Sequence, residues 1–251
     1  MDPILNRGER LCEINDRVRL IAREDGLTFG TDAYLLSAFC RHAPNARAAD
    51  LGCGTGVISL LLAARSRFAH IYAVEAQEQF AKLTERNVTL NDFCSTVTPL
   101  LCDVRNLTPA MTGGELDVVF TNPPYMRADT GYACTHGEKQ IARHEVLGDL
   151  YDFTRAAARV LRFGGSLYTV YRPDRLETLF AALKEAKFAP KRMLFVQDAP
   201  DKAPSMVLVE SRLGGAEGLV LLPTLILREA AQNGAPLTPR AARIYETGSI
   251  E

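Results

Sequence analysis

Short apolar runs alternate with helical patterns along most of the chain, and this alternation limits the fold more than any other feature. The runs have the length of strands, and the segments between them carry apolar residues at a helical period. Such alternation is typical of a mostly parallel sheet with helices on both faces. The predicted strands lie at residues 46–51, 70–75, 95–101, 117–120, 166–171, 193–196 and 206–210, and the predicted helices at 57–65, 77–91, 149–161 and 174–186.

These elements predict an α/β fold with a seven-stranded, mostly parallel, doubly wound, Rossmann-like sheet. The last two strands suit an antiparallel pair at the sheet edge. Gly164 and Gly165 predict a turn between a helix and the fifth strand. The tail at 236–240, P-L-T-P-R, is expected to be a loop.

Residues 46–251 are expected to form one domain, with residues 1–45 packed on it as an N-terminal extension. Within that extension, V-R-L-I-A at 18–22 predicts a short strand. The run at 31–40 predicts a helix with Thr31 at its N-cap.

Composition narrows the class of protein. With 47% apolar residues the chain can bury a core, and it has no apolar run of about 18 residues that would cross a membrane. Six scattered cysteines and four histidines favour free thiols over a metal site. The N-terminus lacks a signal-peptide layout, so we expect a cytoplasmic protein. The oligomeric state is left open, a monomer included.

Net charge is −1, which does not indicate a general nucleic-acid binder. Charge is uneven, however: residues 151–193 carry nine Lys and Arg against four Asp and Glu. Solvated helix faces would explain this excess, and so would a surface that contacts phosphates.

A glycine-rich turn, D-L-G-C-G-T-G at 50–56, follows the first core strand and opens a helix. Its glycines allow a tight turn and a close approach of a ligand to the main chain. The G-x-G-x-G spacing differs from the dinucleotide G-x-G-x-x-G, so a pyrophosphate loop is a weaker interpretation. Glu75 ends the second strand, where a carboxylate can accept hydrogen bonds from both ribose hydroxyls. Asp103 ends the third strand and would meet an adenine amino group or cap the next helix.

The strand at 117–120 runs into T-N-P-P-Y. Neither proline has an N–H with which to continue a sheet ladder, and the two rings fix the backbone between Asn122 and Tyr125. A rigid turn that merely ends a strand is one interpretation of this segment.

Together, the glycine turn, Glu75, Asp103 and N-P-P-Y resemble the class I S-adenosylmethionine-dependent methyltransferases. In that family the turn lies against the methionine portion of the cofactor, the acid after the second strand holds the ribose, and the third acid lies near the adenine. The resemblance implies cofactor contacts from Gly30, Thr31, Asp32, Asp50, Gly52, Cys53, Gly54, Gly56, Glu75, Ala76, Asp103, Val104 and Asn122.

Methyl transfer to a planar amine explains the N-P-P-Y segment. The lone pair of the amine is delocalised, so two fixed acceptors must take its N–H groups and aim the lone pair at the methyl. The side-chain oxygen of Asn122 and the carbonyl of Pro123 would do this, while Pro124 stiffens the loop and Tyr125 stacks on the base. No general base is needed, because the proton can leave after the transfer.

Three further stretches resemble the bacterial tRNA N6-adenine methyltransferases that modify adenosine 37 of a valine tRNA. They are F-G-T-D-A-Y-L-L-S-A-F at 29–39, A-R-H-E at 142–145, and the run from 167 to 227, in which P-T-L-I replaces the commoner P-P-L-I. The resemblance implies that tRNA is the partner. The substrate-contact candidates are Arg143, His144, Arg172, Lys191 and Arg192.

Two alternatives remain. N-P-P-Y also resembles enzymes that methylate a glutamine side chain of release factors, because both substrates present a planar NH₂. Those enzymes carry a helical domain ahead of the core, for which about 45 residues leave little room. The other alternative is a non-catalytic RNA-binding module that keeps a cofactor fold.

Overall fold

The computed structural model describes residues 3–24, 30–124, 148–232 and 234–250. Its strands are β1 (Glu9–Glu13), β2 (Arg19–Arg23), β3 (Ala43–Leu51), β4 (Phe68–Glu75), β5 (Val97–Leu101), β6 (Leu116–Thr121), β7 (Leu161–Tyr171), β8 (Phe188–Gln197), β9 (Met206–Leu213), β10 (Val220–Leu221) and β11 (Leu225–Ile226). Its α-helices are α1 (Thr31–Phe39), α2 (Val57–Ala63), α3 (Glu78–Leu90), α5 (Leu150–Val160), α6 (Leu176–Glu185) and α7 (Pro239–Thr247). Three short 3₁₀ turns are η1 (Val104–Asn106), η2 (Pro109–Thr112) and η3 (Pro173–Arg175).

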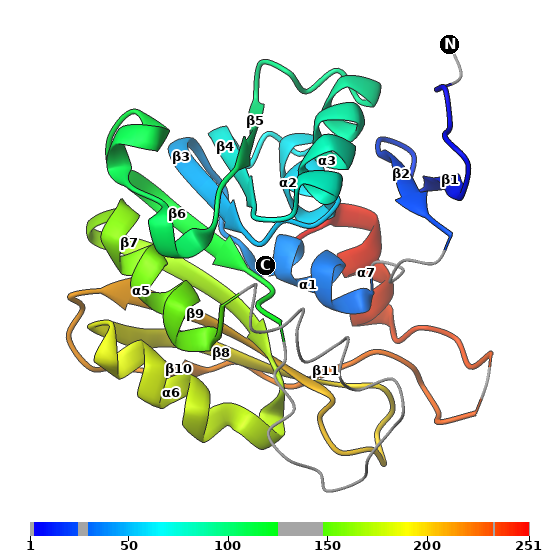
Figure 1. Ribbon diagram of the computed structural model, residues 1–251. Helices are drawn as coiled ribbons and strands as arrows, with labels where there is room; N and C mark the ends of the chain where they lie inside the picture. The colour runs from blue at the N-terminus through cyan, green and yellow to red at the C-terminus, as the bar shows by residue number, and fades with distance from the viewer. Residues whose placement is uncertain (1–2, 25–29, 125–147, 233, 251) are drawn as a thin grey trace, which may run out of the picture.

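The central sheet has the strand order β10-β8-β9-β7-β6-β3-β4-β5, with β11 also paired to β8 (Figure 1). Neighbours from β7 to β5 run parallel, and β9 is antiparallel to both β7 and β8. The predicted α/β class and the antiparallel pair are confirmed. The strand number was wrong: the described sheet has nine strands. The two additional strands are two residues long, which is too short for alternation to indicate them.

Helices cover both faces of the sheet, as the doubly wound prediction requires (Figure 1). Val118 and Phe120 pack into one apolar cluster with α1, α2 and α7, whereas Val119 packs into a second cluster with α5 and α6. Successive side chains of a strand point to opposite faces, so a strand between two helical layers is apolar on both sides. This explains why the central strands are nearly continuous apolar runs. None of the helices in the described ranges is both long and apolar enough to span a membrane.

Three local predictions differ from the structure. Gly164 and Gly165 lie inside β7, at an irregularity in its pairing with β6, and not in a turn before it. The N-cap of α1 is Gly30, so Thr31 is the first helical residue. The tail is not a loop: Thr238 caps α7 through its side chain, and Pro239 occupies the first helical position.

The N-terminal hairpin of β1 and β2 docks on α3 through two amides. Asn87 accepts a hydrogen bond from the N–H of Ile21 (2.7 Å) and donates to its carbonyl (3.1 Å). Asn91, one turn later, accepts a hydrogen bond from the N–H of Arg19 (2.8 Å) and donates to its carbonyl (2.7 Å). The two side chains therefore pair with the backbone of β2 much as a neighbouring strand would.

An ion pair adds to this docking. Arg86 binds both carboxylate oxygens of Glu9, at 2.6 and 2.9 Å, and these hydrogen bonds lower the pKa of Glu9 to about 2. By contrast, α1 belongs to the central core, where Leu35 and Leu36 are fully buried. The residues before β3 thus divide into a docked hairpin and an integral helix.

Candidate functional site

The segments singled out in the sequence meet at one edge of the sheet. Strands β3, β4, β5 and β6 are parallel neighbours, and the glycine turn, Glu75, Asp103 and Asn122 stand at or just beyond their carboxyl ends. In open α/β sheets ligands bind outside this edge. The first turn of α1 reaches the same place, since Asp32 contacts Asn122.

The glycine turn requires glycine at two positions in particular. Gly52 has φ +73°, and a Cβ there would lie 2.9 Å from the ring of Phe153. Gly56, the N-cap of α2, has φ +83°, and a Cβ would lie 2.9 Å from Cγ2 of Thr84. At Gly54 a Cβ would meet nothing within 4 Å. The two ends of the turn, Gly52 and Gly56, therefore pack against side chains, whereas its centre at Gly54 is open.

Side chains hold the backbone of this turn in place. Glu75 accepts from the N–H of Gly54 (3.0 Å), and Thr84 donates to the carbonyl of Gly54 (2.8 Å). Asn87 donates to the carbonyl of Thr55 (3.0 Å). Glu75 also accepts from the N–H of Gln77 (2.9 Å), and it is buried. Each carboxylate oxygen can accept a second hydrogen bond, so these contacts leave acceptor capacity for a diol.

Asp50 is a fully buried carboxyl at the end of β3. Ser59 donates to Oδ2 (2.8 Å), whereas Oδ1 has no hydrogen-bond partner among the described residues. Burial, opposed by the Ser59 hydrogen bond, raises the pKa of Asp50 to about 7. A buried polar atom without a partner is costly, which makes Oδ1 a natural contact for a donor on a bound cofactor.

Asp103 caps the 3₁₀ turn η1 through the N–H of Arg105 (2.8 Å). The Arg105 guanidinium also binds both of its carboxylate oxygens and lowers the pKa of Asp103. The cap that the sequence offered as one alternative is thus formed. The contact with an adenine stays a prediction, as do the contacts of Ala76, which follows Glu75, and of the buried Val104.

Asn122 is fixed by a residue from the opposite side of the site. Its Nδ2 donates to Oδ2 of Asp32 at 2.7 Å, and the other carboxylate oxygen of Asp32 accepts from the N–H of Ala33 (2.9 Å). The amide nitrogen is thus engaged, and the side-chain oxygen is the kind of acceptor that an incoming N–H requires. Pro123 is buried and Pro124 half-buried, so the rings hold this segment against the core.

Of the described substrate candidates, Arg172 lies at this edge of the sheet and Lys191 and Arg192 do not. Arg172 is exposed, follows β7 directly and forms an ion pair with Asp174 (2.7 Å). Lys191 donates to the carbonyl of Ala216, and Arg192 forms a buried ion pair with Glu210. Burial of Arg192 is the physical reason against its predicted contact with a substrate. Tyr125, Arg143 and His144 lie outside the described residues.

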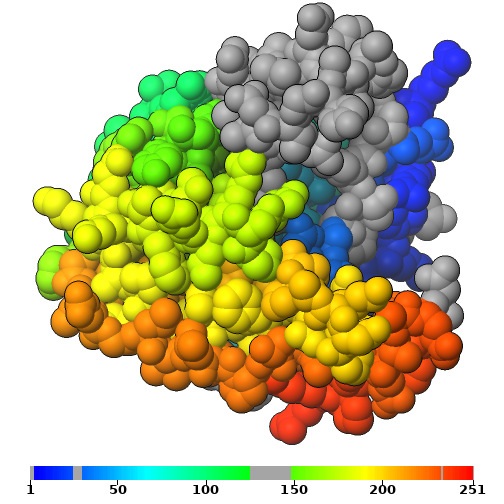
Figure 2. All heavy atoms as spheres, turned by 90° about the horizontal axis from the view of Figure 1, so that it is seen from below, coloured from blue at the N-terminus to red at the C-terminus, as the bar shows by residue number. Residues whose placement is uncertain are grey.

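A pocket of about 590 Å³ adjoins the Asp32–Asn122 contact. Figure 2 views the molecule from this side, where blue atoms of the early chain lie deep in a hollow beside yellow-green and gold atoms of the later chain. Of its lining, the sequence analysis selected Thr31, Asp32 and Arg172, but not Tyr171 at the end of β7 or Pro204, Ser205 and Met206 at the start of β9. Tyr171 could have been predicted, because it ends a strand parallel to those of the site. No local pattern indicates the residues at the start of β9. The pocket is lined by Thr31, Asp32, Tyr171, Arg172, Pro173, Asp174, Pro204, Ser205 and Met206.

Curated relatives match most of the chain. A tRNA1(Val) (adenine(37)-N6)-methyltransferase of Parabacteroides distasonis is 27% identical over 181 residues, which cover 72% of this chain and 75% of that protein. A protein of the same name from Tolumonas auensis is 28% identical over 181 residues, covering 72% and 74%.

Solved structures share the fold. A protein of Agrobacterium tumefaciens described as a predicted O-methyltransferase superposes with a TM-score of 0.69 at 22% identity, over 88% of this chain and 98% of that one. A 16S rRNA N2 G1207 methyltransferase of T. thermophilus, in complex with AdoMet and guanosine, gives a TM-score of 0.56 at 19% identity, over 84% and 52%.

The family model described as "Methyltransferase small domain" matches residues 24–188. This match runs from the segment before α1 to the start of β8, and it includes the glycine turn, Glu75, Asp103 and the proline segment. The chain belongs to the methyltransferase small domain family.

Proposed function

We propose that the protein transfers a methyl group from S-adenosylmethionine to N6 of an adenine in tRNA, with adenosine 37 of a valine tRNA as the first candidate. One observation carries the chemistry: the Asn122 amide is locked by Asp32 at 2.7 Å, beside a glycine turn on the neighbouring strand. The names of the curated relatives support the choice of tRNA. A tRNA substrate would place the enzyme in the cytoplasm.

The residues beside the glycine turn fit the cofactor. Oδ1 of Asp50 is a buried acceptor that calls for a donor, and the open centre of the turn at Gly54 leaves room for a ligand against the main chain. Glu75 has acceptor capacity for the two ribose hydroxyls. Bound S-adenosylmethionine supplies a methyl group on a positively charged sulfur, ready for in-line displacement.

The proline segment would orient the acceptor amine. The side-chain oxygen of Asn122 and the carbonyl of Pro123 would each accept one N–H of the adenine amino group, which turns its lone pair toward the methyl. These acceptors act best when they need not reorganise during the reaction. Asp32 serves this purpose by holding the Asn122 amide in one orientation, so we assign it a positioning role beside its predicted contact with the cofactor.

The target base would enter the pocket next to Asp32. The aromatic ring of Tyr171 and the apolar side chains of Pro204 and Met206 contribute to its lining, and planar apolar walls suit a base removed from its stack. A single-stranded loop offers such a base at low cost, because no base pair has to be broken. Stacking by Tyr125 stays a prediction for a residue beyond the described ranges.

The test supplies purified protein with methyl-labelled S-adenosylmethionine and, in separate reactions, unmodified tRNA or a release factor. We expect label in tRNA, released as N6-methyladenosine on digestion, and none in the protein acceptor. Label in the release factor would keep the amide chemistry and replace the substrate. If neither is labelled and the cofactor does not bind, the non-catalytic RNA-binding alternative takes over.

A further inference from the structure

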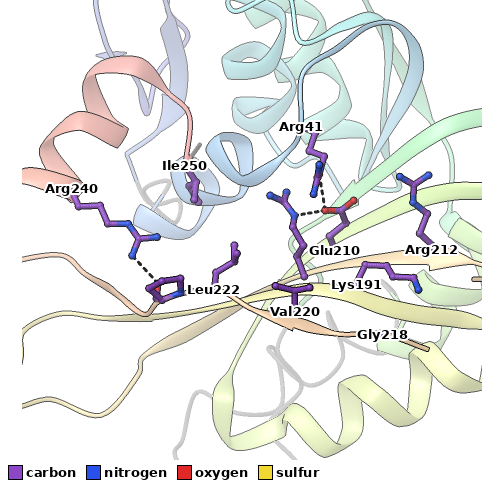
Figure 3. Close-up of a pocket in the computed structure, with 11 residues that line it drawn as sticks. Arg41, Lys191, Glu210, Arg212, Gly218, Val220, Leu222, Arg240 and Ile250 are labelled. Atoms are coloured by element: carbon purple, nitrogen blue, oxygen red, sulfur yellow. Dashed lines mark hydrogen bonds and ion pairs between the residues drawn. The ribbon is translucent and has the colours of Figure 1, made fainter. Parts of the chain in front are cut away.

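A second pocket, of about 630 Å³, lies at the opposite end of α1 from Asp32. Figure 3 shows Arg41 above the sheet, just after α1, with Arg240 of α7 at one end of the pocket and Arg212 with Lys191 at the other. The sequence analysis named Lys191 and Arg192 as candidate contacts of the substrate. Both line this pocket, and neither lines the pocket beside Asp32.

The lining of this pocket is strongly cationic. It has four arginines and one lysine but a single carboxylate, that of Glu210. Glu210 is buried and already bound by two of the cations: Arg192 at 2.5 Å and Arg41 at 3.3 Å. One negative charge thus stands against five positive ones. A concave surface with such an excess attracts anions more strongly than a flat one does.

Backbone carbonyls orient the outer cations without neutralising them. Arg212 donates to the carbonyl of Gly164 (2.9 Å), and Arg240 donates to those of Pro223 and Thr224 (2.8 and 3.1 Å). A guanidinium has five N–H donors in a planar fork, so one or two such contacts fix it and still leave donors for a ligand. This arrangement is preorganised for an anion with several oxygens.

Apolar side chains lie between the cations. Val220 and Leu222 line the pocket along the segment of β10, and Ile250 lines it from the far side (Figure 3). Val220 is 56% exposed, so its side chain is accessible to a ligand in the pocket. A bare hydrated ion gains nothing from such a surface, whereas a phosphate that carries a sugar and a base can cover it.

We propose that this pocket binds a backbone phosphate of the RNA substrate, with the attached nucleoside against Val220 and Leu222. The proposal rests on the proposed function for the identity of the RNA. From Asp32 to Phe39, the last residue of α1, the helix advances about 10 Å at 1.5 Å per residue, and Arg41 follows two residues later. About three stacked nucleotides, at 3.4 Å each, span the length of this helix. The contact would position the tRNA without reading its sequence.

The test measures equilibrium binding of fluorescent unmodified valine tRNA between about 50 and 200 mM salt. The test variant is Arg212→Gln/Arg240→Gln. Its control is Arg17→Gln/Arg243→Gln, which removes the same charge from exposed sites outside the pocket, one of them on the same helix α7. Thermal melting and S-adenosylmethionine binding establish that both variants are folded.

The test variant is expected to bind tRNA about tenfold more weakly, by the strength of a charged hydrogen bond. The slope of log K against log salt should fall by about 1, while the control stays near wild type. For methylation, KM for tRNA should rise and kcat at saturating tRNA should hold.

Equal losses in both variants would overturn the proposal, since net charge alone would then explain them. An unchanged test variant would overturn it as well. A test variant that loses affinity for a polyglutamate peptide, but not for tRNA, would replace the RNA with an acidic protein partner. If the wild type binds tRNA but does not methylate it, the proposed function fails, and the binding data still decide the pocket.

Discussion

The glycine turn and the proline segment follow neighbouring strands, β3 and β6, but they are held in different ways. The turn is fixed by side chains from β4 and α3, through Glu75, Thr84 and Asn87. The proline segment is stiffened by its own rings, and Asp32 of α1 holds its Asn122. Because the turn shares hydrogen bonds with β4 and α3, a substitution there should also change the stability of the fold. The proline segment is stiff by itself, so a substitution there should mainly change the rate of methyl transfer. The two sides of the site should therefore respond differently to substitution.

The largest effect is expected on the turn side, from Asp50→Asn. The folded-state pKa of Asp50 is raised from 3.8 to about 7, so the folded protein holds its proton where the unfolded chain has lost it. The wild type should therefore lose stability as pH rises from about 4 to about 7, by about 4 kcal/mol from this residue. Chemical denaturation across that pH range should show a flatter profile for the variant.

Absolute stability is not the criterion in that experiment, because a buried amide makes new contacts of its own. The difference in slope between variant and wild type is the quantity that matters. Asp16→Asn, at an exposed position, controls for the loss of one aspartate. Parallel profiles for Asp50→Asn and the wild type would show that the buried carboxyl does not hold a proton near neutral pH.

On the proline side, Asn122→Ala should lower kcat by about 10²–10³, the usual cost of losing one preorganised hydrogen-bonding group. Affinity for S-adenosylmethionine and thermal stability should fall far less than kcat, since the amide is held by Asp32 of α1. Single-turnover kinetics and calorimetric titration of the cofactor measure the two effects separately. Wild-type turnover in this variant would end the assignment of Asn122.

Gly56→Ala tests the turn itself and should cost about 2 kcal/mol of stability. An alanine must adopt φ +83°, which costs about 1–2 kcal/mol, and its Cβ must displace Thr84. Gly8→Ala is the matched control, because Gly8 has φ +80° with nothing within 4 Å of a Cβ. Weaker cofactor binding should accompany the loss at Gly56 only. Equal losses at both positions would show that crowding by Thr84 contributes nothing.

The smallest of these effects is expected from Asp32→Ala, which should lower kcat about tenfold through loss of a charged hydrogen bond to Asn122. Asp32→Asn keeps the shape and one acceptor, so it should restore part of the rate. The affinity of the Asp32 variants for S-adenosylmethionine distinguishes a contact with the cofactor from the positioning of Asn122. A higher Kd for S-adenosylmethionine at unchanged kcat would assign the residue to the cofactor and not to Asn122.

Much of this architecture could be predicted because its signals are local. The strand, glycine turn and helix from β3 to α2 follow from periodicity and from glycine alone. Thr238-Pro239 was also a local signal, an N-cap followed by a proline at the first helical position, but two prolines near each other suggested a loop. The bulge at Gly164 could not be told from a turn, because glycine permits both.

Contacts between distant residues could not be predicted. Asp32 and Asn122 are 90 residues apart, and no pattern in either segment indicates the other. Arg192 sits in a basic stretch whose composition suggests an exposed surface, yet its partner Glu210 comes from β9 and draws it into the core. Burial of that kind depends on strand register, which only the assembled sheet defines.

The amides of Asn87 and Asn91 have a consequence for association between molecules. A two-stranded sheet has two open edges, and an open edge is a template on which another chain can add a strand. Here α3 closes the edge of β2 at Arg19 and Ile21 with side-chain amides, so no second chain can add a strand at those residues. The amides protect this edge against aggregation without lengthening the sheet.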